Sequence, residues 1–450
     1  MGRTAALRAV LAEAGFRRLY ATRLVSAVAD GSFQAALASY VLFNPERATT
    51  PAEAAAALTA LALPYSLIGP FVGVFLDRWR RQRVLVIGNT VKAALVVGVA
   101  ALVADRAENG AFLAVTIAAL SVNRLFLAAL SAALPHVVPE NYLVTANAVA
   151  TTSGTVATII GAGIGGSLRL AAGTHALALG GVVAAAALGY LGSALVARRF
   201  AADELGPDVP LAVPMWHAVH AVLAGLAAAA RHVAQRQRVA SALAAISAHR
   251  FCYGMATLTI VLLERNYFAH ENQAVRGLFG LGAVVGASGL GIVAAALVTP
   301  RVTRRIGTTR WVAAMLCAAG TAVAVFGLPF QRELLIAGAF VLGFSAQGMK
   351  ICVDTIVQAD VADNFRGRVF SGYDMLYNVT YVAAAAAAAA ALPPSGKSDA
   401  VMSGLAAGYV LAGLSFAWFT RGAVVRERPM VGRQPERVAA QPPGNFQDAR

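Results

Sequence analysis

The sequence predicts an all-α integral membrane protein with twelve transmembrane helices in two six-helix halves. Of its 450 residues, 58% are hydrophobic and 13% are charged, and the mean hydropathy is +0.65. Such a chain is too apolar for a surface that meets water on all sides. Its apolar residues form continuous runs of about 20 residues, the length that a helix needs to cross a bilayer. The runs show no period-two alternation, which favours helices over barrel strands.

The predicted spans follow one another with short polar turns between them. The eleventh span includes a long alanine tract at 383–391, which makes it the least apolar of the set. The twelve spans are 20–43, 55–76, 84–104, 111–134, 145–168, 176–197, 239–263, 277–299, 311–328, 333–356, 369–392 and 400–420.

The turn between the second and third spans indicates the orientation of the chain. It contains Arg78, Arg80, Arg81 and Arg83. Short loops rich in arginine stay in the cytoplasm, so we expect this turn, and with it both termini, to be cytoplasmic in the cell membrane. The same pattern accounts for the net charge of +15. Because the arginines are not gathered into one basic patch, we expect no binding of nucleic acid.

The longest connection divides the spans into six and six. Its second part has Trp216, Val219, Leu223 and Leu226 at helical spacing, which predicts an amphipathic helix on the membrane surface. We expect a proline-rich tail after the last span to be disordered. The predicted units are an N-terminal six-helix bundle (1–199), a cytoplasmic linker (200–238), a C-terminal six-helix bundle (239–421) and the tail (422–450).

The two halves partly repeat each other. A second charged turn, Arg301, Arg304 and Arg305 followed by Gly307, lies between the eighth and ninth spans. Internal repetition of a six-helix unit is typical of secondary transporters, whose halves move about a site near the middle of the membrane.

No sequence feature indicates a cofactor or a metal. The cysteines Cys252, Cys317 and Cys352 lie singly inside apolar runs, so neither a disulfide nor a zinc site is expected. The phosphate-binding pattern GxxxxGK[ST] does not occur in the sequence, which argues against ATP as the energy source. We therefore expect neither an enzyme nor a metalloprotein.

The turn after the second span resembles the signature of the major facilitator superfamily, which Gly73, Asp77, Arg78 and Arg81 match. Other stretches resemble its drug and siderophore exporter branch, although Ala162 replaces the proline of the exporter pattern. These stretches are Arg124, Pro139–Glu140, Ala146-Asn147-Ala148, the glycine-rich segment 161–166 and the segment 366–371.

The resemblance implies a monomeric, proton-coupled antiporter that exports a small amphipathic compound (a drug, siderophore or lipid-like molecule) by alternating access. Its partners would be that substrate, protons and membrane lipids. An alternative of another class is a transporter-like protein that acts as a sensor or assembly partner without transport.

The resemblance also implies a conformational latch at the second turn. Gly73, Asp77, Arg78 and Arg81 would link the cytoplasmic ends of the two halves, with Asp77 at the N-terminus of the eleventh span, where free N–H groups favour an anion. An ordinary solvated turn explains the same residues without a latch.

Two ionisable residues within spans are candidates for proton coupling. Asp30 lies near the middle of the first span with no cation three or four residues away. Arg124 in the fourth span resembles the arginine of this superfamily that is implicated in proton coupling, and a purely structural ion pair is the alternative. A charge at this depth is costly, so each is expected to face a cavity or a partner, and we expect Arg124 to be the partner of Asp30. A structural hydrogen bond between helices is an equally good explanation of Asp30.

Four residues of the C-terminal half are candidates for the substrate cavity: Asp374, Tyr377, Asn378 and Arg250. His249 is expected to face the same cavity. The nearby Lys350 and Asp354, four residues apart, are expected to neutralise each other. Lys92 in the third span is expected to extend toward the membrane surface and has no assigned role.

Overall fold

A computed structural model describes residues 3–42, 50–56, 58–59, 69–76, 78–105, 110–139, 142–172, 176–206, 214–268 and 274–421. Every regular element in this part of the chain is a helix. The elements that precede the linker are α1 (Arg3–Ala12), α2 (Ala14–Leu42), η1 (Gly69–Phe71), α4 (Val72–Leu76), α5 (Arg81–Ala104), α6 (Gly110–Ala133), η2 (Leu134–His136), α7 (Leu143–Ala172) and α8 (Ala176–Ala197).

The linker contributes one helix, and the rest belong to the C-terminal half. Two of these elements, η4 and η5, are short π-helical continuations of the helices before them. The elements are α9 (Met215–Ala234), α10 (Gln237–Leu262), η4 (Leu263–Tyr267), α11 (Ala274–Ile306), α12 (Thr308–Ala322), η5 (Val323–Gly327), α13 (Arg332–Asp360), α14 (Asp363–Ala391) and α15 (Asp399–Phe419).

The predicted class, an all-α membrane protein, is confirmed. Within the described residues, nine helices are long and apolar enough to cross a bilayer. The helices α2 and α14, with 29 residues each, are also long enough but more polar. The predicted span 55–76 falls partly on residues outside the described ranges, and the predicted tail 422–450 lies entirely outside them.

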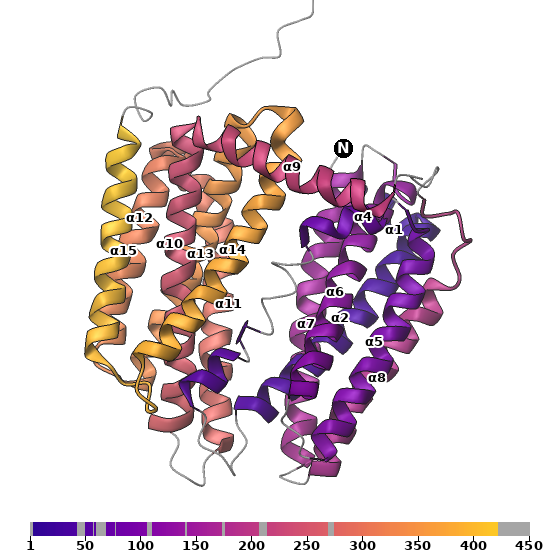
Figure 1. Cartoon of the computed structure of the whole chain (residues 1–450), viewed down its shortest axis with the longest axis horizontal. Helices are drawn as coiled ribbons and strands as arrows, with labels where there is room; N and C mark the ends of the chain where they lie inside the picture. Colours follow the sequence, from indigo (N-terminus) through magenta and orange to yellow (C-terminus); the bar gives the residue numbers. More distant parts are fainter. Residues whose placement is uncertain are drawn as a thin grey trace, which may run out of the picture.

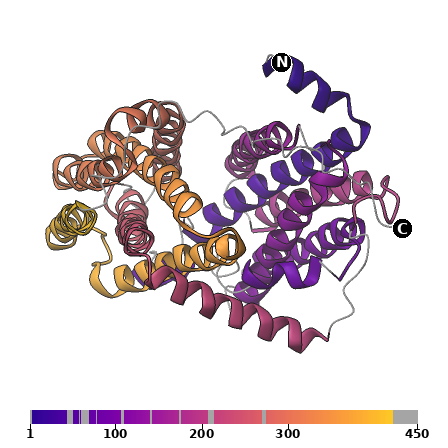
Figure 2. The same ribbon diagram turned by 90° about the horizontal axis from the view of Figure 1, so that it is seen from above.

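The helices form two bundles, one from each half of the chain (Figure 1). At one end of the molecule, α9 runs alongside both bundles and connects them, which Figure 2 shows from above. This helix lies within the stretch where the sequence predicts an amphipathic one. Trp216 and Leu223 on α9 are exposed, whereas Gly225 and Ala229 are buried. Two of the four predicted apolar residues, Trp216 and Leu223, are therefore left uncovered by the described part of the protein.

Glycines allow two helices of the N-terminal bundle to approach closely. Gly161 and Gly165 on α7 lie directly against the backbone carbonyls of Val28 and Ser32 on α2, where a β-carbon has no room. Gly163 faces open space instead. Only one face of α7 makes this close contact, because successive residues of a helix point in different directions.

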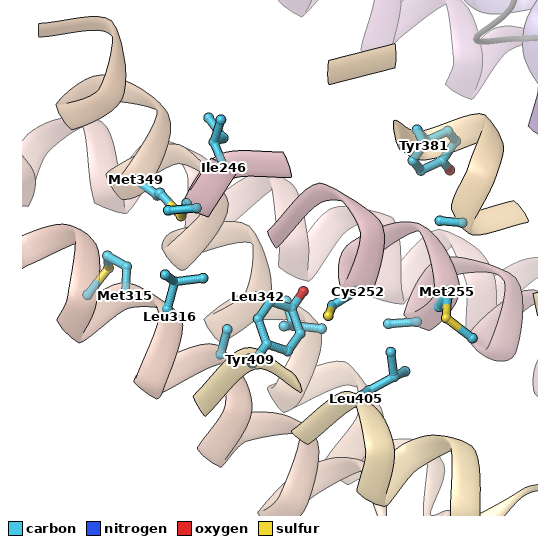
Figure 3. Packing of buried hydrophobic residues seen from close by; sticks show 14 of the residues in the cluster. Ile246, Cys252, Met255, Met315, Leu316, Leu342, Met349, Tyr381, Leu405 and Tyr409 are labelled. Atoms are coloured by element: carbon cyan, nitrogen blue, oxygen red, sulfur yellow. The ribbon is translucent and has the colours of Figure 1, made fainter. Parts of the chain in front are cut away.

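The hydrophobic core of the C-terminal bundle is built around α10, the most buried of the nine candidate spans. Figure 3 shows this core, where Cys252 and Met255 on α10 meet Leu405 and Tyr409 on α15. Tyr409 is fully buried. Close packing here fixes α10, which brings Arg250 to the candidate site described below.

The charged turn of the second half differs from the prediction. The eighth span was expected to end at residue 299, but α11 continues to Ile306, so Arg301, Arg304 and Arg305 lie on its last turns. Cations are favourable there because the C-terminus of a helix carries a partial negative charge. Gly307 then makes the turn into α12 with a positive φ of 85°, a backbone conformation that suits glycine.

Candidate functional site

Asp30 belongs to a buried polar cluster in the N-terminal bundle. Lys92 on α5 donates a hydrogen bond to the Asp30 carboxylate and a second one, of 2.7 Å, to the side-chain oxygen of Asn123 on α6. The Tyr190 hydroxyl on α8 donates to the same Asp30 oxygen at 3.0 Å. Asp30 and Lys92 are 6% and 1% exposed. The Asp30–Lys92 ion pair and its two hydrogen-bond partners therefore connect four helices, α2, α5, α6 and α8.

This cluster corrects two predictions. The cation that contacts Asp30 is Lys92 and not Arg124, and Lys92 does not extend to the membrane surface. Its ammonium also lies 4.1 Å from the ring centroid of Tyr190, a favourable cation–π distance. Burying a lone ammonium is expensive, and an opposite charge with further hydrogen bonds offsets that cost. Lys92 and Asp30 thus compensate each other.

Arg124 pairs across the two halves of the molecule. Its Nη2 lies 3.8 Å from the Oδ2 of Asp374 on α14, and the two side chains are 28% and 55% exposed. At this place η1, which contains Gly69, also contacts α14. The Arg124 side chain extends toward Gly69. The pair therefore lies where the N-terminal and C-terminal halves touch.

A second ion pair lies near Asp374. Lys350 and Asp354 on α13 are 3.1 Å apart, which confirms the predicted pairing along one helix. The Lys350 ammonium is 5.1 Å from the ring centroid of Tyr373. Lys350 and Asp354 are both electrostatic neighbours of Asp374, together with Arg124. Asp374 is consequently surrounded by two cations and one further acid.

Arg250 lies among aromatic rings. Its guanidinium carbon is 4.3 Å from the ring centroid of Tyr377 and 4.2 Å from that of Tyr381, both on α14. Tyr253, one turn along α10, is 5.8 Å away. Arg250 and Tyr377, two predicted cavity residues, are therefore in contact. The Arg250 guanidinium is held by its attraction to the faces of these aromatic rings.

Two other predicted cavity residues are directed elsewhere. The side-chain nitrogen of Asn378 donates to the backbone oxygen of Asp374 at 2.8 Å, so it bonds to its own helix. His249 is 2% exposed, and its ring packs near those of Tyr253 and Tyr409. The prediction that His249 faces the cavity is thus wrong, because it points into the core of the C-terminal bundle.

Arg81 connects three segments of the N-terminal half. Its guanidinium donates to the backbone oxygens of Ala132, at the end of α6, and Leu205, at 3.0 and 3.1 Å. Its backbone N–H donates to Gly206 at 3.0 Å. All of these partners belong to the N-terminal half or to the start of the linker. In this structure Arg81 fixes the turn rather than bridging the halves.

The rest of the predicted latch is described in part. Gly73 lies in α4 and Arg78 in the turn that follows, whereas Asp77 lies outside the described residues. The end of this second predicted span is close to the other half, since η1 contacts both α14 and α9. The latch stays a prediction.

Sequence reasoning missed Lys92, Asn123 and Tyr190 as partners of Asp30. One signal was available in the sequence. Asp30 and Lys92 both lie deep within predicted spans, and each requires an opposite charge there, so they could have been paired with each other. It also missed Glu264, which is fully buried on η4 and accepts a 2.7 Å hydrogen bond from Arg332. Within the described residues no group of three metal-ligating side chains occurs.

Comparison with known proteins agrees with this architecture. Residues 19–385 match the family model of the Major Facilitator Superfamily. Two MFS-type transporters, from Mycobacterium bovis and Mycobacterium tuberculosis, are each 38% identical over 427 residues, 95% of this chain and 95% of theirs.

The fold also resembles solved transporter structures of low sequence identity. The nucleoside transporter NupG superposes with a TM-score of 0.65 at 16% identity, covering 91% of this chain and 99% of that one. A peptide transporter POT in complex with sulfate has a TM-score of 0.65 at 15% identity, covering 92% and 95%. With the family match over most of its length, this chain belongs to the major facilitator superfamily of membrane transporters and is not an enzyme.

Proposed function

We propose that this protein is a secondary active transporter that couples proton movement to the export of a small amphipathic compound by alternating access. The observation that carries the proposal is the Arg124–Asp374 pair between the two halves. A contact across the halves changes whenever they rock apart, so a charge on one partner affects the conformational equilibrium.

The chemistry assigns different parts to the two partners. Arginine keeps its positive charge at all relevant pH values, whereas a carboxylate can take up a proton. Protonation of Asp374 would remove its attraction to Arg124 and favour separation of the halves. Release of the proton on the other side of the membrane would restore the pair. Proton entry would in this way be coupled to the conformational cycle.

The surroundings of the pair indicate the substrate class. Arg250 and Tyr377, both half-buried, offer a cation and an aromatic ring, while Asp374 offers an anion. A compound with a flat apolar body and a polar or charged end matches such a surface. This chemistry supports a small amphipathic substrate over a sugar-like one.

Asp30 remains a second candidate for proton coupling, now with Lys92 as its counter-charge. The pair lies inside the N-terminal bundle, so a proton would reach it when α2, α5, α6 and α8 separate enough to admit water. The turn with Asp77, Arg78 and Arg81 is proposed as the latch of one conformation. We further propose a cell-membrane protein with both termini cytoplasmic that functions as a monomer.

The test is a transport assay in proteoliposomes with an imposed pH gradient. The purified protein would be supplied with a panel of lipophilic cations, siderophores and lipids, and flux would be compared with and without the gradient. We expect gradient-dependent flux of at least one amphipathic compound by the wild type. Asp374→Asn should uncouple that flux from the gradient, whereas Asp399→Asn, on the exposed first turn of α15, should behave as wild type.

Two results would contradict the proposal. Full gradient-dependent transport by a folded Asp374→Asn protein would exclude Asp374 as the coupling acid. Absence of gradient-dependent flux over the whole panel would favour a sensor or assembly partner that does not transport.

A further inference from the structure

A groove of about 580 Å³ lies on the outer side of the N-terminal bundle, between the first turns of α5 and the second half of α6. Arginines occupy one end, where Arg78, Arg80 and Arg83 line it. Apolar side chains line the rest, among them Val91 on α5 and Leu125 on α6. The groove is therefore cationic at the end near the turn and hydrophobic along its length.

The apolar part of the groove is exposed on the surface of a candidate membrane span. Ile87 and Val91 are 58% and 43% exposed, although they belong to a span with a mean hydropathy of 2.0. Exposed apolar side chains on the outside of such a span would contact acyl chains. Gly88 lies between them and leaves the groove open, since a β-carbon there would touch no more than Val122 at 3.8 Å. From Arg83 to Val91 the helix rises about 12 Å, enough for much of one acyl chain.

The cationic end lacks a counter-charge within the described part of the chain. A terminal nitrogen of Arg78, Nη2, is buried with no hydrogen-bond partner there. The first turn of α5 has no acidic residue, and Arg80 at its N-cap makes no side-chain cap. Free N–H groups and the partial positive charge of a helix N-terminus add to the arginines. Trp79, 49% exposed, lies at the same level, as tryptophans do at membrane interfaces.

We propose that this groove binds one anionic phospholipid. Its phosphate would contact Arg78, Arg80 and Arg83, and one acyl chain would lie along Ile87 and Val91 between α5 and α6. Arginine forms paired charge-assisted hydrogen bonds with phosphate oxygens, and clusters of arginines next to a span favour anionic lipids. A free phosphate would leave the hydrophobic length of the groove unused, which is why we assign a lipid. The proposal does not depend on the transport mechanism proposed above.

Native mass spectrometry of the full chain, purified in detergent, tests this assignment. Dioleoylphosphatidylglycerol would be added, with dioleoylphosphatidylcholine as the zwitterionic lipid of equal chain length. We expect one phosphatidylglycerol molecule to stay bound. Phosphatidylcholine has the same phosphodiester but also a choline cation, which the arginines repel, so it should bind more weakly by about tenfold.

Two variants separate the parts of the groove, and a third is the control. Arg80→Gln/Arg83→Gln removes charge at the phosphate end, and Gly88→Leu fills the apolar part. Each should weaken phosphatidylglycerol binding by about tenfold. The control Arg301→Gln/Arg305→Gln removes two exposed arginines from the end of α11, away from this groove, and should leave binding unchanged.

Several outcomes would overturn the proposal. Equal retention of the two lipids would show that charge does not select the occupant. Unchanged binding by Gly88→Leu would mean that the headgroup alone is recognised. An equal loss in the Arg301→Gln/Arg305→Gln control would mean that net charge, and not the groove, attracts the lipid. Displacement of the lipid by inorganic phosphate at equal concentration would assign the site to a free anion.

Discussion

The ammonium of Lys92 and the carboxylate of Asp30 lie inside a bundle that itself lies in a bilayer, so neither charge reaches water. Each is tolerable because the other is present, with Asn123 and Tyr190 completing the hydrogen bonds. Arg124 and Asp374 differ in this respect, since both are partly exposed and water screens their attraction. Two ion pairs of similar composition are thus expected to respond very differently to the loss of one partner.

At the residue scale we expect Asp30→Asn to destabilise the protein by about 3–5 kcal/mol, because it leaves the Lys92 charge buried without an anion. Thermal unfolding in detergent would measure the loss. The double variant Asp30→Asn/Lys92→Met should recover much of it, since a neutral apolar side chain replaces the stranded charge. A single variant as stable as the wild type would mean that water reaches Lys92.

At the scale of single elements, the contact between α2 and α7 depends on which face of α7 the small residues occupy. Gly161 and Gly165 lie against the backbone of α2, whereas Gly163 does not. The contact surface is thus a narrow strip of one helix.

We expect Gly161→Ala to cost about 1–3 kcal/mol, because the new methyl group overlaps the carbonyl of Val28 and forces α2 and α7 apart. The matched change Gly163→Ala should be neutral or stabilising by about 0.5–1 kcal/mol, since alanine is the better helix former and the site is open. Unfolding in detergent would compare the two. Equal losses in both variants would contradict the close contact.

The docking of α9 on α14 should depend on pH. The ring of His232 on α9 stacks on that of Phe365 on α14, with the ring centroids 4.3 Å apart. Desolvation lowers the pKa of His232 below its usual value, and the positive charge of Arg236 is a second cause. A lowered pKa means that the docked state binds protons less readily than the free state. The contribution of His232 to the stability of the docked α9 is therefore fully present above about pH 6.5. It is lost as the pH falls through the lowered pKa of His232.

Hydrogen exchange of the α9 amides, measured at about pH 5 and about pH 8 and corrected for intrinsic rates, would detect the change. We expect less protection at the lower pH in the wild type and a smaller difference in His232→Gln. The same difference in both proteins would exclude His232 as the cause.

At the scale of the whole molecule, the two halves meet through both polar and apolar contacts. Besides the linker helix α9, the described contacts between the halves include the Arg124–Asp374 pair and the contact of η1 with α14. Ala54, Ala55 and Leu58 of the N-terminal half also pack into the hydrophobic core of the C-terminal bundle. A movement of one bundle relative to the other would have to change these contacts, so each of them affects the equilibrium between the conformations.

We expect Asp374→Asn to increase the distance between the halves at the end that carries α9. An exposed pair contributes about 0.2–1 kcal/mol, so the population of the separated form should rise by at most about fivefold. Spin labels at positions 199 and 305 would report the distance distribution. An unchanged distribution, with Asp399→Asn as the reference, would exclude a role for the pair in joining the halves.

The sequence by itself determined the membrane class, the helices, the family and the site of the amphipathic helix α9, because hydropathy and turn residues are properties of neighbouring positions along the chain. It also located the costly charges, Asp30, Arg124 and Asp374. The tertiary structure alone decided their partners. Successive helical residues point about 100° apart, so hydropathy does not report which way Lys92 or His249 faces. Lys92 reaches Asp30, and Arg124 reaches Asp374, because the packing of the whole molecule turns these side chains toward each other across many intervening residues.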